Sequence, residues 1–299
     1  MDDSFFALVR LFLSTLLPDN SIRGFVRGAV VGIAIGFALV VVSEVIRSPP
    51  SSPFRCDDPS LQALQERDIL PTAPYLLVVW ASSHAVVLVN EMWRPGVSWT
   101  DATYWAARHT RRLFVGLVIS GDITSIIKMA FNSKRPFFID ACQPAVRLPN
   151  GTEVLVCSGR PVAPGPRSGV PSVFGGGEHS EYRRVSSRTP VTGDVTDYRC
   201  TGPKGPKSGD SFPSGHAAVA GFAAVFMFGY SIRRCVGFEQ PCRAAFLAVY
   251  LGALVLVVCL QRVLQHKHFP EDVVCGSVFG AVMALVFVVW PYGDAKATA

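Results

Sequence analysis

Residues 211–231, SFPSGHAAVAGFAAVFMFGYS, join a turn rich in small residues to an uncharged apolar run. Proline is tolerated at a helix start, because its missing N–H would lack an intrahelical partner there. Ser214 and Gly215 would expose backbone N–H groups at the positive end of the helix dipole, where proteins bind phosphate. His216 adds a proton donor beside that anion. The stretch predicts a membrane helix with an anion site at its start, although a serine cap and a structural histidine are common alternatives.

The whole 299-residue chain is apolar, with 49% hydrophobic and only 17% charged residues. This composition is typical of a membrane protein. Six consecutive apolar segments leave no room for amphipathic helices that could bury them in a soluble fold. We therefore expect an all-α polytopic membrane protein with six spans, at Phe25–Ile46, Ala73–Asn90, Leu113–Ile127, Ala217–Ser231, Ala244–Gln261 and Val273–Trp290.

The formal charge of +6 does not indicate nucleic-acid binding, because the cations lie at the ends of apolar runs and no nucleic-acid motif is present. The positive-inside rule explains them better. Three groups share one side of a six-span chain, which places that side and both termini in the cytosol. These groups are Arg10, Arg23 and Arg27; Arg94, Arg108, Arg111 and Arg112; and Arg233, Arg234 and Arg243.

The domain boundaries follow from this topology. Residues 1–22 form a cytosolic segment with an interfacial helix or an unstructured tail, residues 23–292 the six-span domain, and residues 293–299 a cytosolic tail. A long outer loop at 137–210 contains the glycosylation acceptor at Asn150. Four outer cysteines allow three disulfide pairings, which the sequence does not separate: Cys56, Cys142, Cys157 and Cys200.

Two further stretches carry chemistry. Lys128 and Arg135 are seven residues apart at the end of the third span, so both cations lie on one helical face. Membrane anchoring by snorkelling is the alternative for this pair. At the junction of the last two spans, Asp272 follows His268 by four residues, so its carboxylate could hold the imidazole in one tautomer, while Arg262 grips an oxyanion. All three stretches fall on the same outer face.

This inventory suits phosphoryl transfer through a phosphohistidine. Cations and backbone donors would stabilise the transferring group, a neutral His268 would attack phosphorus, and His216 would protonate the departing oxygen. Arginine and lysine would do the work of Mg²⁺, and no acidic cluster is present to hold it, so we expect neither a metal nor another cofactor.

The spacing of the three stretches resembles the signature of the type-2 phosphatidic acid phosphatase superfamily, and the chain around it is similar to the animal lipid phosphate phosphatases. The resemblance implies an active site at the extracytosolic ends of the third to sixth spans. It implies His268 as nucleophile, His216 as acid and Asp272 as orienter. It also implies a phosphate-binding set of Lys128, Arg135, Ser214, Gly215 and Arg262. One departure is Gln261, where the family usually has serine.

The expected function is hydrolysis of lipid phosphate monoesters such as phosphatidate, lysophosphatidate, sphingosine phosphate or ceramide phosphate. The alternatives are an isoprenoid diphosphate phosphatase and a catalytically silent membrane interaction or transport protein. The expected partners are the lipid substrate and the bilayer. The sequence leaves open whether the protein forms a homo-oligomer. The active site would be extracellular or luminal, in the plasma membrane or an endomembrane.

Overall fold

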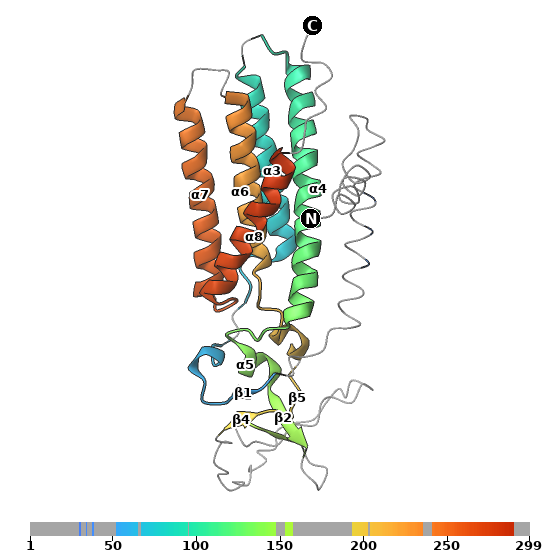
Figure 1. The fold of residues 1–299 in the computed structure, drawn as a ribbon, viewed down its shortest axis with the longest axis vertical. Helices are drawn as coiled ribbons and strands as arrows, with labels where there is room; N and C mark the ends of the chain where they lie inside the picture. The colour runs from blue at the N-terminus through green and yellow to red at the C-terminus, as the bar shows by residue number, and fades with distance from the viewer. Residues whose placement is uncertain are drawn as a thin grey trace, which may run out of the picture. The chain divides into compact units, whose positions relative to one another are not determined.

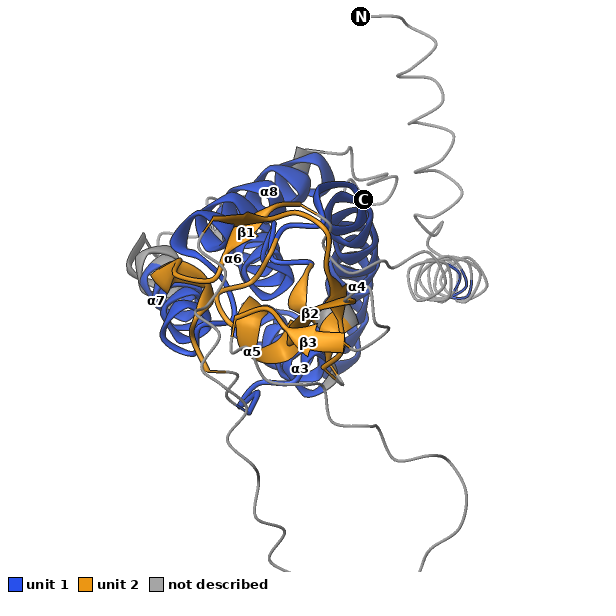
Figure 2. Ribbon diagram, turned by 90° about the horizontal axis from the view of Figure 1, so that it is seen from below, with its two compact units in different colours: residues 1–47, 66–133, 210–299 blue, residues 48–65, 134–209 orange. Residues whose placement is uncertain are grey.

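The computed structural model describes residues 30, 34, 38, 52–64, 67–94, 96–147, 153–157, 193–202, 204–235 and 241–289. The expected first span, both terminal segments and Asn150 lie outside these residues, apart from three single positions of that span. The chain divides into two compact units (Figure 2). Unit 1 comprises residues 1–47, 66–133 and 210–299, and unit 2 comprises residues 48–65 and 134–209.

The described residues of unit 1 form a helical bundle, in which five long helices run side by side (Figure 1). They are α3 (Thr72–Met92), α4 (Trp99–Phe131), α6 (Gly215–Cys235), α7 (Pro241–Leu264) and α8 (Pro270–Val289). Within the described residues, four helical stretches are long and apolar enough to cross a membrane, and α7 has a shorter apolar stretch at Leu251–Leu264. A mostly helical membrane protein is therefore confirmed.

Helix α4 begins well before the expected third span. Ser98 caps its first turn by accepting a hydrogen bond from Asp101 N at 3.2 Å, and Asp101 Oδ2 accepts one from Ser98 Oγ at 2.6 Å. The helix has 33 residues, hence a length of roughly 50 Å, more than the ~30 Å hydrocarbon core requires. Arg108, Arg111 and Arg112 lie inside this helix rather than in a loop, because charged side chains end an apolar run without ending a helix.

Helices α6 and α8 pack closely because glycines face backbone at their interface. A Cβ atom on Gly276 would lie 2.4 Å from Ser214 O, and one on Gly280 would lie 1.9 Å from Ala218 O. A Cβ atom on Gly221 would lie 2.3 Å from Ser277 O. Small residues allow this approach of two membrane helices. The contact fixes the start of α6 against the start of α8.

We expect Gly280→Ala to destabilise the protein by about 1–3 kcal/mol, because the added methyl meets a backbone carbonyl that cannot rotate away. Gly252→Ala on α7 is the matched control, since a Cβ atom there meets nothing within 4 Å. Thermal denaturation of the detergent-purified variants measures both. Equal melting temperatures for the two variants would contradict the close packing of α6 on α8.

The described residues of unit 2 form one short α-helix, two 3-10 turns and two small sheets. The helical elements are η1 (Pro59–Leu61), α5 (Phe138–Cys142) and η2 (Gly205–Ser208). Strand β1 (Phe54–Arg55) pairs antiparallel with β4 (Asp194–Val195). The other sheet has the order β3-β2-β5, with β2 at Pro144–Arg147, β3 at Glu153–Leu155 and β5 at Arg199–Cys200. The sequence predicted no strands here, because two to four residues are too few to show alternation.

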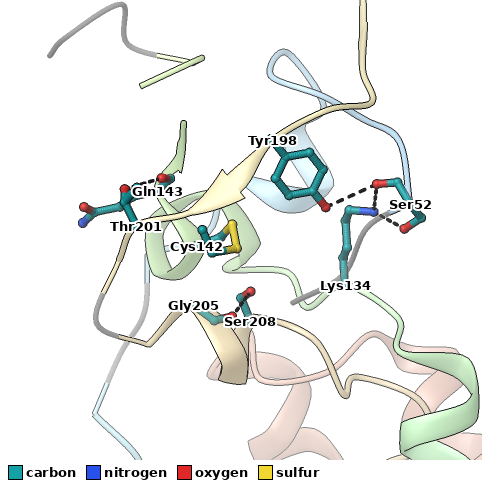
Figure 3. The surroundings of a disulfide bond; sticks show 9 residues. Ser52, Lys134, Cys142, Gln143, Tyr198, Thr201, Gly205 and Ser208 are labelled. Atoms are coloured by element: carbon teal, nitrogen blue, oxygen red, sulfur yellow. Dashed lines mark hydrogen bonds between the residues drawn. A yellow bond between two sulfur atoms is a disulfide. The ribbon is translucent and has the colours of Figure 1, made fainter. Parts of the chain in front are cut away.

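Two disulfides cross-link unit 2, Cys56–Cys157 and Cys142–Cys200. They select one of the three pairings that the sequence left open. Beside the second disulfide, Lys134 Nζ donates to Ser52 O at 2.6 Å and to Ser52 Oγ, and Tyr198 Oη donates to the same carbonyl at 3.3 Å (Figure 3). Burial lowers the pKa of Lys134 and raises that of Tyr198 to about 12. The Tyr198 hydroxyl therefore keeps its proton at neutral pH.

Candidate active site

Five described helix ends meet at one end of unit 1: the C-terminal ends of α4 and α7 and the N-terminal ends of α3, α6 and α8 (Figure 1). Ser133, just after α4, accepts hydrogen bonds from Ser211 N at 3.0 Å and, through its Oγ, from Phe212 N at 2.7 Å. Ser214 N donates to Asp272 O at 2.9 Å. These backbone contacts bring together the three stretches singled out in the sequence.

The start of α6 has the features of an anion site. Ser214 is fully buried, and its Oγ has no hydrogen-bond partner among the described residues. Gly215 lies beside Lys128, because a Cβ atom on this glycine would be 4.0 Å from Lys128 Cε. Lys128 Nζ in turn donates to Asp210 O at 2.6 Å. An unused hydroxyl, a helix N-terminus and a cation therefore lie together.

His268 is 4% exposed, and its Nδ1 lies 2.8 Å from Ser211 O. A carbonyl oxygen can only accept, so Nδ1 carries the hydrogen in this contact. In the neutral ring, Nε2 then has the lone pair. The ring is therefore held in the tautomer that a nucleophile at Nε2 requires.

Asp272 supports this ring less directly than the sequence suggested. Its Oδ2 is 3.7 Å from His268 Nδ1, but it accepts hydrogen bonds from Ser211 Oγ at 2.5 Å and Phe269 N at 2.9 Å. The carboxylate thus fixes Ser211, and the carbonyl of Ser211 contacts the imidazole. Ser211 is a contact residue that the sequence analysis missed, although it opens the first stretch considered.

His216, in the first turn of α6, is held by the chain just before α3. Its Nε2 donates to Leu70 O at 2.9 Å, and its ring stacks on Tyr75 with centroids 4.9 Å apart. Tyr75 Oη donates to His216 O at 3.0 Å. Because Nε2 is used by a carbonyl, Nδ1 is the ring atom left to exchange a proton with a ligand.

Arg262 is 2% exposed and reaches the same segment. Its Nη1 donates to Asp68 Oδ1 at 3.0 Å and its Nη2 to Leu70 O at 2.6 Å. Its Nε has no hydrogen-bond partner among the described residues. The guanidinium is thus immobilised on one side and has a hydrogen left for an anion.

Gln261 stands where the family usually has serine, and its side chain is hydrogen-bonded to a neighbouring glutamine. Its Nε2 donates to Gln265 Oε1 at 2.6 Å, one turn further along α7. Within the described chain, Gln261 Oε1 and Gln265 Nε2 have no hydrogen-bond partner. This bond uses one of the two hydrogens on Gln261 Nε2, so only the second could be donated to a phosphate.

Two predicted residues, Arg135 and Asn150, are not among the described residues of unit 1. Arg135 belongs to unit 2, where its Nε donates to Gly209 O at 2.9 Å and its guanidinium lies 5.7 Å from the centroid of the Phe137 ring. Its place beside the phosphate stays a prediction. Asn150 lies outside the described residues. In the described part of the chain, no group of three or more His, Cys, Asp or Glu side chains could hold a metal ion.

Asp68, Leu70 and Tyr75 were missed because their partners are distant in sequence. Leu70 and His216 are separated by 146 residues, and Asp68 and Arg262 by 194. No spacing or periodicity relates residues so far apart. Leu70 also acts through its backbone carbonyl, which no residue pattern marks.

The model of the PAP2 superfamily matches residues 109–295, more than half of the chain. Phospholipid phosphatase-related protein type 3 of Rattus norvegicus is 24% identical over 278 residues, 83% of this chain and 33% of that protein. The type 4 protein of the same organism is 26% identical over 181 residues, 60% of this chain and 19% of that protein. Phospholipid phosphatase 2 of Mus musculus is 21% identical over 262 residues, 83% of this chain and 79% of that protein.

This chain therefore spans a third or less of the two related proteins. No solved structure gave a significant match. The matched residues include Lys128, His216, Arg262, His268 and Asp272, so the signature lies inside the region of family similarity. With its apolar helices and this match over more than half its length, the chain is an integral membrane protein that belongs to the PAP2 superfamily, the type-2 phosphatidic acid phosphatases.

Proposed function

We propose that this protein is a metal-independent phosphatase that hydrolyses lipid phosphate monoesters through a phosphohistidine at His268. The observation that carries the proposal is the hydrogen bond from His268 Nδ1 to Ser211 O, because it leaves Nε2 as the nucleophilic atom. The substrate class includes phosphatidate, lysophosphatidate, and sphingosine or ceramide phosphate. The names of the phospholipid phosphatase relatives favour this class.

In the first step, Nε2 of His268 forms a bond to phosphorus and the bond from phosphorus to the lipid oxygen breaks. Protonated His216 gives the hydrogen on Nδ1 to that oxygen, so the lipid leaves as an alcohol. In the second step, a water molecule attacks the phosphohistidine, and His216 takes a proton from it. Inorganic phosphate leaves and His268 regains its lone pair.

The charge on the transferring group is stabilised by fixed donors rather than by a metal. Arg262 supplies its Nε hydrogen, Ser214 its hydroxyl, and Gly215 its backbone N–H at the start of α6. Lys128 adds a positive charge beside Gly215. The proposal also includes Arg135, which belongs to unit 2, because it stands in the same signature stretch as Lys128.

We place the active site on the extracellular or luminal face and both termini in the cytosol. The two disulfides of unit 2 support this orientation, since disulfides persist in oxidising compartments. Arg94, two residues after the end of α3, and Arg108, in the first half of α4, lie toward the opposite ends of these helices, in agreement with the positive-inside rule. The proposed membranes are the plasma membrane or an endomembrane, and a homo-oligomer is compatible with the proposal.

The test is phosphate release by the purified protein from a panel of lipid phosphates, isoprenoid diphosphates and a soluble phosphate ester. We expect release from the lipid monoesters to be unchanged by EDTA, because protein cations and not a metal face the phosphate. Loss of turnover on chelation, restored by Mg²⁺, would refute the metal-free mechanism. Preference for a diphosphate would select the isoprenoid alternative, and no release from any substrate would select the silent membrane protein.

A further inference from the structure

The segment Arg67–Pro71, which we call the α3 leader, supports the site from outside the three signature stretches. It precedes α3 directly, and Pro71 O accepts a hydrogen bond from Tyr75 N at 3.1 Å. Leu70 O accepts hydrogen bonds from both His216 and Arg262, at 2.9 and 2.6 Å. One carbonyl therefore positions the predicted acid and a predicted phosphate-binding cation.

The carboxylate of Asp68 organises this leader. Its Oδ1 accepts a hydrogen bond from Leu70 N at 3.1 Å, which closes a local turn, and another from Arg262 Nη1 at 3.0 Å. The same oxygen thus shapes the backbone that presents Leu70 O and grips the guanidinium that Leu70 O also contacts. Without the carboxylate, a cation that is 2% exposed would lose its anionic partner.

The hydrogen bonds of Arg262 indicate that Asp68 positions the guanidinium and does not block its contact with phosphate. Asp68 engages Nη1 and Leu70 engages Nη2, while Nε has no hydrogen-bond partner among the described residues. A phosphate oxygen could therefore bind Nε without displacing Asp68. The side chain of Asp68 is 40% exposed, so it neutralises part of the charge on Arg262 without being sealed beneath it.

We propose that Asp68 is a positioning residue that holds Arg262 with its Nε available for phosphate, and that it also sets the carbonyl of Leu70 that carries His216. This inference rests on the proposed phosphatase function. It assigns to the α3 leader a role in phosphate binding, outside all three signature stretches.

The experiment is kinetics of Asp68→Ala and Asp68→Asn on a lipid phosphate, with Asp68→Glu as the conservative rescue. Misplacing a substrate-binding group costs up to about 10²-fold, so we expect Asp68→Ala to lower kcat/KM by about 10- to 100-fold, chiefly through KM. Asp68→Asn keeps the hydrogen-bond acceptor but not the charge, so its kcat/KM should lie between those of Asp68→Ala and the wild type. Asp68→Glu should recover most of the loss.

Asp57→Ala is the matched control, because Asp57 also pairs with an arginine, Arg55, at 2.7 and 2.9 Å but lies on an exposed surface of unit 2. It should leave the kinetics unchanged. A double-mutant cycle adds a test that a purely structural role would fail: in the Arg262→Ala background, Asp68→Ala should no longer raise KM, and the loss that remains should fall on kcat through Leu70 and His216. Additive increases of KM in the cycle, or wild-type KM in Asp68→Ala, would overturn the inference.

Binding of orthovanadate, a phosphate analogue, separates this inference from the proposed function. Thermal stabilisation gives its apparent affinity, and Asp68→Ala should need about tenfold more orthovanadate than the wild type. If no substrate is hydrolysed but this shift occurs, the phosphatase proposal fails and the role of Asp68 stands. If substrates are hydrolysed and Asp68→Ala changes neither KM nor the affinity for orthovanadate, only the role of Asp68 fails. A wild type that neither hydrolyses nor binds orthovanadate overturns both.

Discussion

His268→Ala is expected to lower turnover by about 10⁴- to 10⁶-fold on every substrate, because removal of a covalent nucleophile leaves only binding and electrostatic stabilisation. The variant loses the imidazole, whose Nδ1 donates to Ser211 O and whose lone pair is therefore on Nε2. The loss should fall on kcat for lipid and aryl phosphates alike, because both need the same attack on phosphorus. Phosphate release under saturating substrate measures it.

His266→Ala is the matched control. His266 lies two residues earlier and is exposed, with a left-handed backbone at φ 52°, so its ring does not share the buried environment of His268. We expect its turnover to stay within about threefold of the wild type, as for other exposed positions. Equal inactivation of the two variants on both substrates would show that the assignment of the nucleophile is wrong.

His216→Ala is expected to slow hydrolysis of a lipid phosphate by about 10²- to 10⁴-fold, the usual contribution of a general acid. The loss should be much smaller on an aryl phosphate, because a phenolate leaves without a proton. The geometry agrees with this role, since Nε2 donates to Leu70 O and Nδ1 is left for the leaving oxygen.

The comparison needs both substrates at several pH values, so that a change in protonation of the enzyme is not mistaken for a change in chemistry. Tyr75→Phe is a useful companion variant, because it keeps the stacking on His216 and removes only the hydrogen bond to His216 O. Tyr75→Phe should lower the rate of lipid phosphate hydrolysis far less than His216→Ala does. An equal loss of activity on lipid and aryl phosphates in His216→Ala would rule out the general-acid role.

Much of the bundle could be predicted from the sequence, because the apolar runs are long and their ends are marked. Pro270 begins α8, as the preference of proline for a helix start suggests, whereas α6 begins at Gly215, two residues after Pro213. It could also be predicted that the three signature stretches lie on the same side of the membrane. The chain crosses the membrane twice between the end of the third span and the end of the fifth, so it returns to the same face. The sequence analysis placed the third span at Leu113–Ile127 and did not predict that its helix begins at Trp99. Ser98 and Asp101, three residues apart, carry a recognisable capping pattern for that start.

The rest depended on contacts that leave no local trace in the sequence. The carbonyl of Ser211, rather than the carboxylate of Asp272, makes the shorter contact to His268. The α3 leader contributes through one backbone oxygen and one carboxylate, each more than a hundred residues from its partner in sequence. The disulfide pairing depended on the fold of unit 2, whose strands are too short for a hydrophobic pattern to reveal.

The most direct test of the proposed mechanism is detection of the covalent intermediate. Purified wild-type protein would be mixed with radiolabelled phosphatidate, quenched in alkali, in which phosphohistidine survives, and digested for mass spectrometry. The mechanism predicts label on the peptide that contains His268, none in His268→Ala, and label at the wild-type level in His266→Ala. Phosphate release by the wild type with no label on His268, or with label on His266 or a serine, would contradict it.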